Sequence, residues 1–186
     1  MKDKITQAFV TKFNEAQQLF LNGKYSESLK NYQILLKKNP KQVSVLNNMG
    51  LVYEKLGNFN DAIICYKECN EIIPTEKTII HNLANAYCKV EKYSEAMPLL
   101  KEIITSDFRN ESNHEKLALC LFYKQSKKET KDFIELAVKK FPNNSLLNEL
   151  LGKTLLHLNS HKDGLKSLQK STGFIEFNNT GVRYLL

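Results

Sequence analysis

Prolines recur at a fixed interval along this chain of 186 residues. Pro40, Pro74 and Pro142 lie 34 and 68 residues apart, and Phe108 occupies the position one interval after Pro74. A period of about 34 residues is typical of arrays in which each repeat is a pair of helices joined by a turn. Because proline lacks an amide donor and restricts the residue before it, it suits the end of the second helix. We therefore expect about five helix pairs in succession.

Residue size at equivalent positions follows the same period. One position is small in every repeat and lets the two helices of a pair come close, while another is large and apolar. In the second repeat we expect helices at about 43–56 and 59–72, separated by a turn at Gly57, because glycine tolerates a positive φ. Pro98 lies near the start of a predicted helix, where proline is tolerated. The small residues are Ala16, Gly50, Ala84, Ala118 and Gly152, and the large ones are Leu19, Tyr53, Tyr87, Leu121 and Leu155.

This pattern resembles the tetratricopeptide repeat. The resemblance implies an all-α, right-handed superhelical solenoid over residues 1–171, with about five repeats, and an apolar C-terminal tail at 172–186. The repeats would lie at about 9–42, 43–76, 77–110, 111–144 and 145–171. The fourth copy departs from the pattern at Gln125 and Lys127, and the fifth has Glu176 at the place of the closing proline. The second copy carries the pattern most fully, with Leu46, Met49, Gly50, Tyr53, Gly57, Phe59, Ala62, Tyr66 and Pro74.

Composition excludes several classes of protein. No apolar run approaches the roughly 20 residues that span a membrane, and the first ten residues lack the apolar core of a secretory signal. The net charge of +7 is almost all lysine, because Arg109 and Arg183 are the only arginines. Nucleic-acid contacts favour arginine, so we expect solvated lysines rather than a nucleic-acid partner.

The sequence contains no pattern typical of an active site. A glycine-rich phosphate loop, a GxSxG elbow and an HExxH motif are all absent. The cysteines include no CxxC pair, and we expect them to be buried thiols in a reducing cytoplasm. We therefore predict a cytoplasmic protein that is not an enzyme and holds neither a metal ion nor a cofactor. The cysteines are Cys65, Cys69, Cys88 and Cys120.

The resemblance places the binding surface on the first helix of each repeat, which lines the concave side and holds peptides. Asn14, Asn48 and Asn82 share one position there, 34 residues apart, and Asn85 lies one turn beyond Asn82. An asparagine amide has both a donor and an acceptor, so it can match a peptide unit. The column is similar to the asparagine ladder of O-linked N-acetylglucosamine transferases. The alternative is that these amides cap helices or meet water.

Other candidates for partner binding lie farther along the first helices. Lys89 and Lys116 could meet a carboxylate, but Leu51 stands where the clamp of chaperone-binding members needs an asparagine, so we do not expect that ligand. Leu119, Phe122 and Tyr123 make the same predicted surface apolar. The competing interpretation is that the surface closes over the chain's own tail.

These features predict an interaction scaffold or adaptor that binds a protein or an extended peptide in the concave groove. The alternative is a non-catalytic docking or regulatory module of an enzyme whose catalytic part is elsewhere. The tail alternates apolar runs with a turn-like Asn178–Gly181 segment. We expect it to cap the final repeat or, alternatively, to dock in a second copy and form a homodimer.

Overall fold

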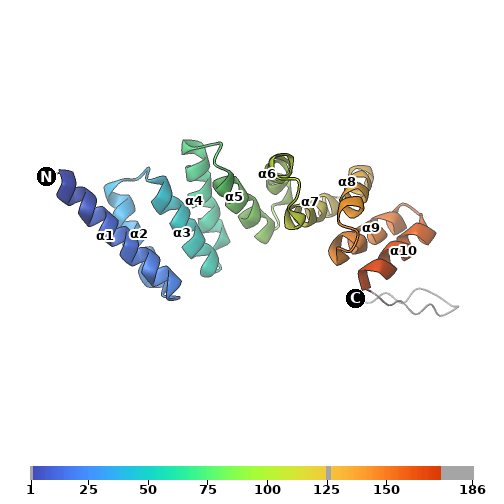
Figure 1. The fold of residues 1–186 in the computed structure, drawn as a ribbon, viewed down its shortest axis with the longest axis horizontal. Coiled ribbons are helices and arrows are strands. Elements are labelled where there is room, and N and C mark those ends of the chain that lie inside the picture. The colour runs from blue at the N-terminus through green and yellow to red at the C-terminus, as the bar shows by residue number, and fades with distance from the viewer. Residues whose placement is uncertain (1, 125–126, 173–186) are drawn as a thin grey trace. The chain divides into compact units, whose positions relative to one another are not determined.

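The structure is a computed structural model, and it describes residues 2–124 and 127–172. Within these ranges the chain forms ten α-helices and no strand (Figure 1), which confirms the predicted all-α class. The second pair, α3 and α4, matches the expected spans to within one residue. The helices are α1 (Lys2–Leu21), α2 (Tyr25–Lys38), α3 (Val43–Lys55), α4 (Phe59–Ile72), α5 (Lys77–Lys89), α6 (Tyr93–Ser106), α7 (Glu111–Tyr123), α8 (Lys127–Lys140), α9 (Ser145–His157) and α10 (His161–Thr172).

The helices belong to two compact units. Unit 1 is Met1–Ser106 and holds α1 to α6, and unit 2 is Asp107–Leu186 and holds α7 to α10. In unit 1 each helix packs against the next one along the chain, from α1 through α6. In unit 2, α8 packs on α7 and α9, while α9 also packs on α7 and α10. Packing between neighbours of this kind is typical of repeat arrays, in which each interface adds to stability.

Small residues allow the close approach of the two helices in a pair. Ala84 and Ala118 are fully buried at this position. Gly50 in α3 leaves room for Tyr66 of α4, because a Cβ atom on Gly50 would lie 2.4 Å from the Tyr66 Cε1 atom. A methyl group at that distance would overlap the ring. In this pair the Tyr66 ring therefore occupies the space that a side chain at position 50 would need.

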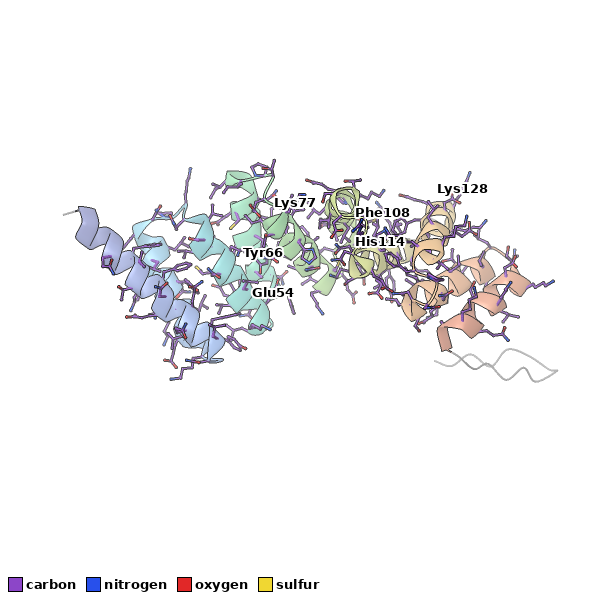
Figure 2. The ribbon with its side chains drawn as sticks, in the orientation of Figure 1. Glu54, Tyr66, Lys77, Phe108, His114 and Lys128 are labelled. Atoms are coloured by element: carbon purple, nitrogen blue, oxygen red, sulfur yellow. The ribbon has the colours of Figure 1, made fainter. Side chains whose placement is uncertain are left out.

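The same tyrosine also makes a polar contact with α3. Tyr66 is fully buried, and its hydroxyl donates a hydrogen bond to Glu54 Oε1 at 3.1 Å (Figure 2). Burial raises the pKa of the Glu54 carboxyl, while the hydrogen bond from Tyr66 opposes the rise. Burial also raises the pKa of the Tyr66 hydroxyl, so it stays a donor at neutral pH.

We expect Glu54→Gln to keep an acceptor for Tyr66 while it removes a partly buried negative charge. A carboxyl whose pKa is higher in the folded than in the unfolded state stabilises the fold at low pH, and this stability is lost as pH rises through the folded pKa. The free energy of unfolding of the wild type should therefore fall relative to that of Glu54→Gln between about pH 4 and pH 7. Urea titrations across this range measure the difference. Glu68→Gln, at an exposed position on α4, is the control, and a Glu54→Gln difference that does not change with pH would contradict the prediction.

The turn inside a pair uses a left-handed residue at one fixed repeat position. Gly23 has a φ of 74°, Gly57 of 78°, Glu91 of 58° and Asn159 of 62°. Glycine adopts this conformation easily and asparagine tolerates it, whereas glutamate rarely does. The repeat geometry, rather than the residue type, therefore fixes the turn at Glu91.

Phe108 occupies the place that Pro40, Pro74 and Pro142 hold in three other repeats. The His114 ring meets it edge-on, with 5.1 Å between ring centroids, and Figure 2 labels both side chains. Lys140 Nζ lies 3.3 Å from the Phe108 ring centroid and donates a hydrogen bond to the Phe108 carbonyl oxygen. A cation over an aromatic ring is attracted to it. Contacts from α7 and α8 thus hold this loop without a proline, while α6 runs unbroken through Pro98, as predicted.

Asn144, directly before α9, joins two helices of unit 2. Its Oδ1 atom accepts a hydrogen bond from the Leu147 backbone N–H at 2.8 Å, which caps α9. Its Nδ2 atom donates to Glu111 Oε1 at 2.5 Å and to Glu115 Oε1 at 2.7 Å, both on α7. Only 9% of Asn144 is exposed. One amide therefore satisfies the start of α9 and ties it to α7.

Two sequence predictions fall outside the described residues. The proposed cap on the final repeat and the proposed homodimer contact both depend on the tail, of which residues 173–186 are not described. They remain predictions, as do the repeat boundaries. None of the helices in the described ranges combines the length and apolar character that a membrane crossing needs.

Candidate functional site

The predicted asparagine column lies on the first helices of unit 1. Asn14 is exposed on α1, while Asn48 on α3 and Asn82 on α5 are half-buried. Asn48 donates its Nδ2 to the Ser44 carbonyl oxygen, one turn earlier in α3, at 2.9 Å. This bond anchors the amide against its own helix and leaves the orientation of its oxygen fixed.

A hydrogen bond between repeats joins Asn82 to a residue that the sequence reasoning missed. Asn82 Nδ2 donates to Asn47 Oδ1 at 3.1 Å, so the link runs from α5 to α3. Asn47 is half-buried and directly precedes Asn48. Asn82 contributes its amide nitrogen and Asn47 contributes its amide oxygen. The bond therefore does not involve the Asn47 nitrogen or the Asn82 oxygen. The two neighbouring asparagines at 47 and 48 were the only sequence signal for this pair.

Asn85 and Lys89 continue along α5. Asn85 is half-buried, and its Oδ1 atom is fully covered without a hydrogen-bond partner among the described residues. Lys89 is exposed in the last turn of α5. Unit 1 therefore holds the predicted residues Asn14, Asn48, Asn82, Asn85 and Lys89, and the structure links Asn82 to Asn47.

The remaining predicted residues lie on α7 in unit 2. Leu119 and Phe122 are half-buried and pack against the core of that unit. Tyr123 is 57% exposed at the end of the helix, and Lys116 is half-buried two turns earlier. Leu150 of α9, at the position equivalent to Lys116, is buried in the core. Of these predicted residues, only Tyr123 is largely exposed.

His157 is a second residue that sequence reasoning did not assign to this surface. Its ring stacks on Phe122, with 6.1 Å between centroids and 18° between planes. His157 is the last residue of α9, and a turn separates it from His161, the first residue of α10. Its repeat position, 34 residues after Tyr123, was the signal that could have found it.

Cys65 and Cys69 are buried in the core of unit 1, and His114 is buried in the core of unit 2. Burial raises the pKa of the Cys65 thiol to about 12 and that of the Cys69 thiol to about 11, so both remain protonated at neutral pH. No group of three or more His, Cys, Asp or Glu side chains in these ranges is placed to hold a metal ion. His114 is 1% exposed and lies in the core among aromatic rings.

Family patterns match the first part of the chain. One described as "TPR repeat" matches residues 16–57, and two described as "Tetratricopeptide repeat" match residues 43–76 and 78–106. All three matches lie within unit 1. They confirm the resemblance that the sequence pattern indicated.

Similar proteins agree with this fold. Hsp70-Hsp90 organizing protein 1 from Glycine max is 24% identical over 107 residues, which is 58% of this chain and 19% of that protein. The chain thus spans about a fifth of the length of that curated relative. The solved structure of MamA from Desulfovibrio magneticus RS-1 matches with a TM-score of 0.78 and 16% identity, covering 89% of this chain and 93% of MamA.

A further solved structure is that of YrrB, described as "a TPR protein with an unusual peptide-binding site". It matches with a TM-score of 0.78 and 15% identity, covering 87% of this chain and 84% of YrrB. At this identity the likeness concerns the fold alone. Together with the MamA match it confirms the predicted fold class, an all-α solenoid of helix-turn-helix repeats.

Proposed function

Because the chain carries tetratricopeptide repeats between residues 16 and 106, we propose that it is an interaction scaffold that holds an extended peptide along the first helices of unit 1. The repeats and the similar proteins support a protein-interaction role in general. The description of YrrB as a peptide-binding protein supports a peptide as the partner.

The hydrogen bond from Asn82 to Asn47 is the observation that carries this proposal. It fixes the two amides relative to each other at 3.1 Å and orients the groups that it does not use. These groups are an N–H donor on Asn47 and a carbonyl acceptor on Asn82. A peptide unit offers the complementary pair, a C=O and an N–H. Amides that are already oriented lose little side-chain entropy when the peptide binds.

The neighbouring polar residues extend this surface. Asn14 and Asn48 occupy the same repeat position on α1 and α3, so they would meet other peptide units of the same ligand. The exposed ammonium group of Lys89 would attract a carboxylate of the ligand. In this proposal Lys116, Leu119, Phe122 and Tyr123 form a separate contact surface on unit 2, which takes side chains rather than backbone.

Backbone methylation of the ligand gives a direct test. Peptides of about 12 residues that bind the full chain are first selected from an array of varied sequences. Methylating their backbone nitrogens removes N–H donors without changing any side chain. We expect methylated copies to bind about tenfold more weakly, because each lost hydrogen bond contributes about 0.5–1.5 kcal/mol. Asn47→Ala with Asn82→Ala should weaken the unmethylated peptides by a similar factor.

Asn60→Ala is the matched control, since Asn60 is exposed on the second helix α4. It should bind every peptide as the wild type does. Thermal unfolding checks that the double variant remains folded. Equal affinity for methylated and unmethylated peptides, or unaltered binding by the double variant, would show that these asparagines do not hold a peptide backbone.

A further inference from the structure

Three aromatic side chains meet where α7 and α9 end in unit 2. Phe122 stacks on His157 at 6.1 Å and 18°, and it meets Tyr123 at 5.7 Å with 84° between the rings. Since α7 packs against α9, the cluster joins two neighbouring repeats. We call Phe122, Tyr123 and His157 the aromatic corner.

The aromatic corner is open to solvent on its outer side. Tyr123 is 57% exposed, His157 is exposed and Leu158 beside it is 36% exposed, whereas Phe122 is half-buried. Two rings at nearly a right angle can receive a third ring that lies parallel to one and edge-on to the other. Both arrangements are favoured between aromatic rings. The geometry therefore suits an aromatic side chain better than a branched aliphatic one.

Lysines predominate in the sequence around the aromatic corner. From Lys116 to Lys128 the sequence has four lysines and no carboxylate, and from Leu150 to Lys162 it has two lysines, two histidines and no carboxylate. The carboxylates that border these two stretches are Glu115, Glu129, Glu149 and Asp163. Lys124 is exposed directly after Tyr123. Lys153, one turn before His157, pairs with Glu149, which lies one turn farther from the corner. Lysines near the site repel a cationic ligand and attract a ligand that carries carboxylates.

We propose that the aromatic corner binds an aromatic side chain that is flanked by carboxylates in the partner peptide. This inference rests on the proposed function, because it names the part of the ligand that unit 2 would take. Stacking against Tyr123 and Phe122 supplies the contact, and the lysines on either side select the acidic flanks. An aromatic residue among lysines or arginines fits the same rings but meets repulsion.

Fluorescence anisotropy with three labelled peptides tests the proposal on the full chain. The probes are GDEFDEG, GDEADEG, which lacks the ring, and GKKFKKG, which reverses the charge. We expect GDEFDEG to bind about tenfold more tightly than either of the others. Its affinity should fall when salt is raised from about 0.05 to 0.5 M, because the lysines are at the surface.

Variants at the corner complete the test. Tyr123→Ser should weaken GDEFDEG about tenfold and His157→Ser about threefold, with circular dichroism unchanged, because both side chains are exposed. Leu21→Ser is the matched control. Leu21 is 71% exposed at the equivalent repeat position of unit 1, and its loss should change nothing. Equal binding of the three probes, or a Tyr123→Ser variant that binds as the wild type does, overturns the proposal.

The same variants separate this inference from the function on which it rests. If the Asn47 and Asn82 double variant loses the array peptides while Tyr123→Ser keeps GDEFDEG binding, the scaffold function stands and the aromatic corner does not. If Tyr123→Ser loses GDEFDEG binding and the Asn47 and Asn82 double variant binds its peptides as the wild type does, the aromatic corner stands and the asparagines are not needed for peptide binding. If the chain is a dimer that Tyr123→Ser converts to a monomer, and GDEFDEG does not bind, a second copy is the occupant and the proposal is wrong.

Discussion

Replacing Asn144 by alanine is expected to lower the free energy of unfolding by about 2–4 kcal/mol. The loss of an N-cap accounts for about 0.5–2 kcal/mol, and hydrogen bonds to charged groups contribute about 1.5–3 kcal/mol. Glu111 is exposed and Glu115 is half-buried, so solvent reduces the contribution of their hydrogen bonds with Asn144 to the free energy of unfolding. Urea titration measures the total, and hydrogen exchange of the amides in α7 and α9 locates it.

Two further variants separate the roles of Asn144. Asn110 caps α7 through the Asn113 N–H at 3.3 Å, from an exposed position, so Asn110→Ala should cost only about 0.5–1 kcal/mol. Asn144→Asp keeps a capping oxygen but brings a third carboxylate against Glu111 and Glu115. Repulsion should raise the pKa of the introduced carboxyl in the folded state. The free energy of unfolding of the Asn144→Asp variant should therefore rise as pH is lowered. Asn144→Ala behaving like Asn110→Ala would show that the bridge to α7 adds nothing.

Gly152→Ala should be the second most damaging change. A Cβ atom there would lie 2.6 Å from Leu168 Cγ and 2.9 Å from the Gly164 carbonyl oxygen of α10. Overpacking typically costs about 1–3 kcal/mol, and a backbone atom cannot move without the helix. Alanine's better helix propensity returns about 1 kcal/mol. Because the Gly164 carbonyl oxygen belongs to the backbone, we expect the upper end of this range and a net loss of up to about 2 kcal/mol, measured as a shift of the urea midpoint.

Double variants test the source of this cost. At Gly50 the close atoms all belong to the Tyr66 ring, so Tyr66→Leu should remove most of the damage that Gly50→Ala causes. Leu168→Ala should relieve Gly152→Ala only in part, because the Gly164 carbonyl remains. If Tyr66→Leu and Leu168→Ala restored the free energy of unfolding equally, α9 and α10 would move apart at no greater cost than side chains do.

The boundaries of α3 and α4 followed from the sequence because the same constraint acts in successive repeats. Small residues such as Gly50 and the turn at Gly57 repeat with one period, so local and tertiary signals agree. The position in the repeat also determines burial more strongly than the residue type does. Asn113 and His114 occupy positions that are aliphatic in the two preceding repeats, yet each is only 1% exposed.

The candidate site was predicted less completely than the fold. The period placed Asn82 and Tyr123 on first helices, but it carries no information on which side chains meet across repeats. Asn82 joins Asn47, which has no asparagine at equivalent positions. His157 meets Phe122 because α7 packs on α9. Such pairs depend on rotamers and on the distance between helices, and neither is periodic in the sequence.

Packing between successive helices has a consequence for how each unit forms. In unit 1 the main packing is between helices that are adjacent along the chain, with α3 also bonded to α5 through Asn47 and Asn82, and in unit 2 α7 also packs on α9. Residues that meet are therefore separated by short stretches of chain, and little entropy is lost in closing the loops between them. Domains with such local contacts fold fast for their size, commonly within milliseconds. Assembly can begin at any helix pair and spread to the next one, so neither unit depends on a single nucleus.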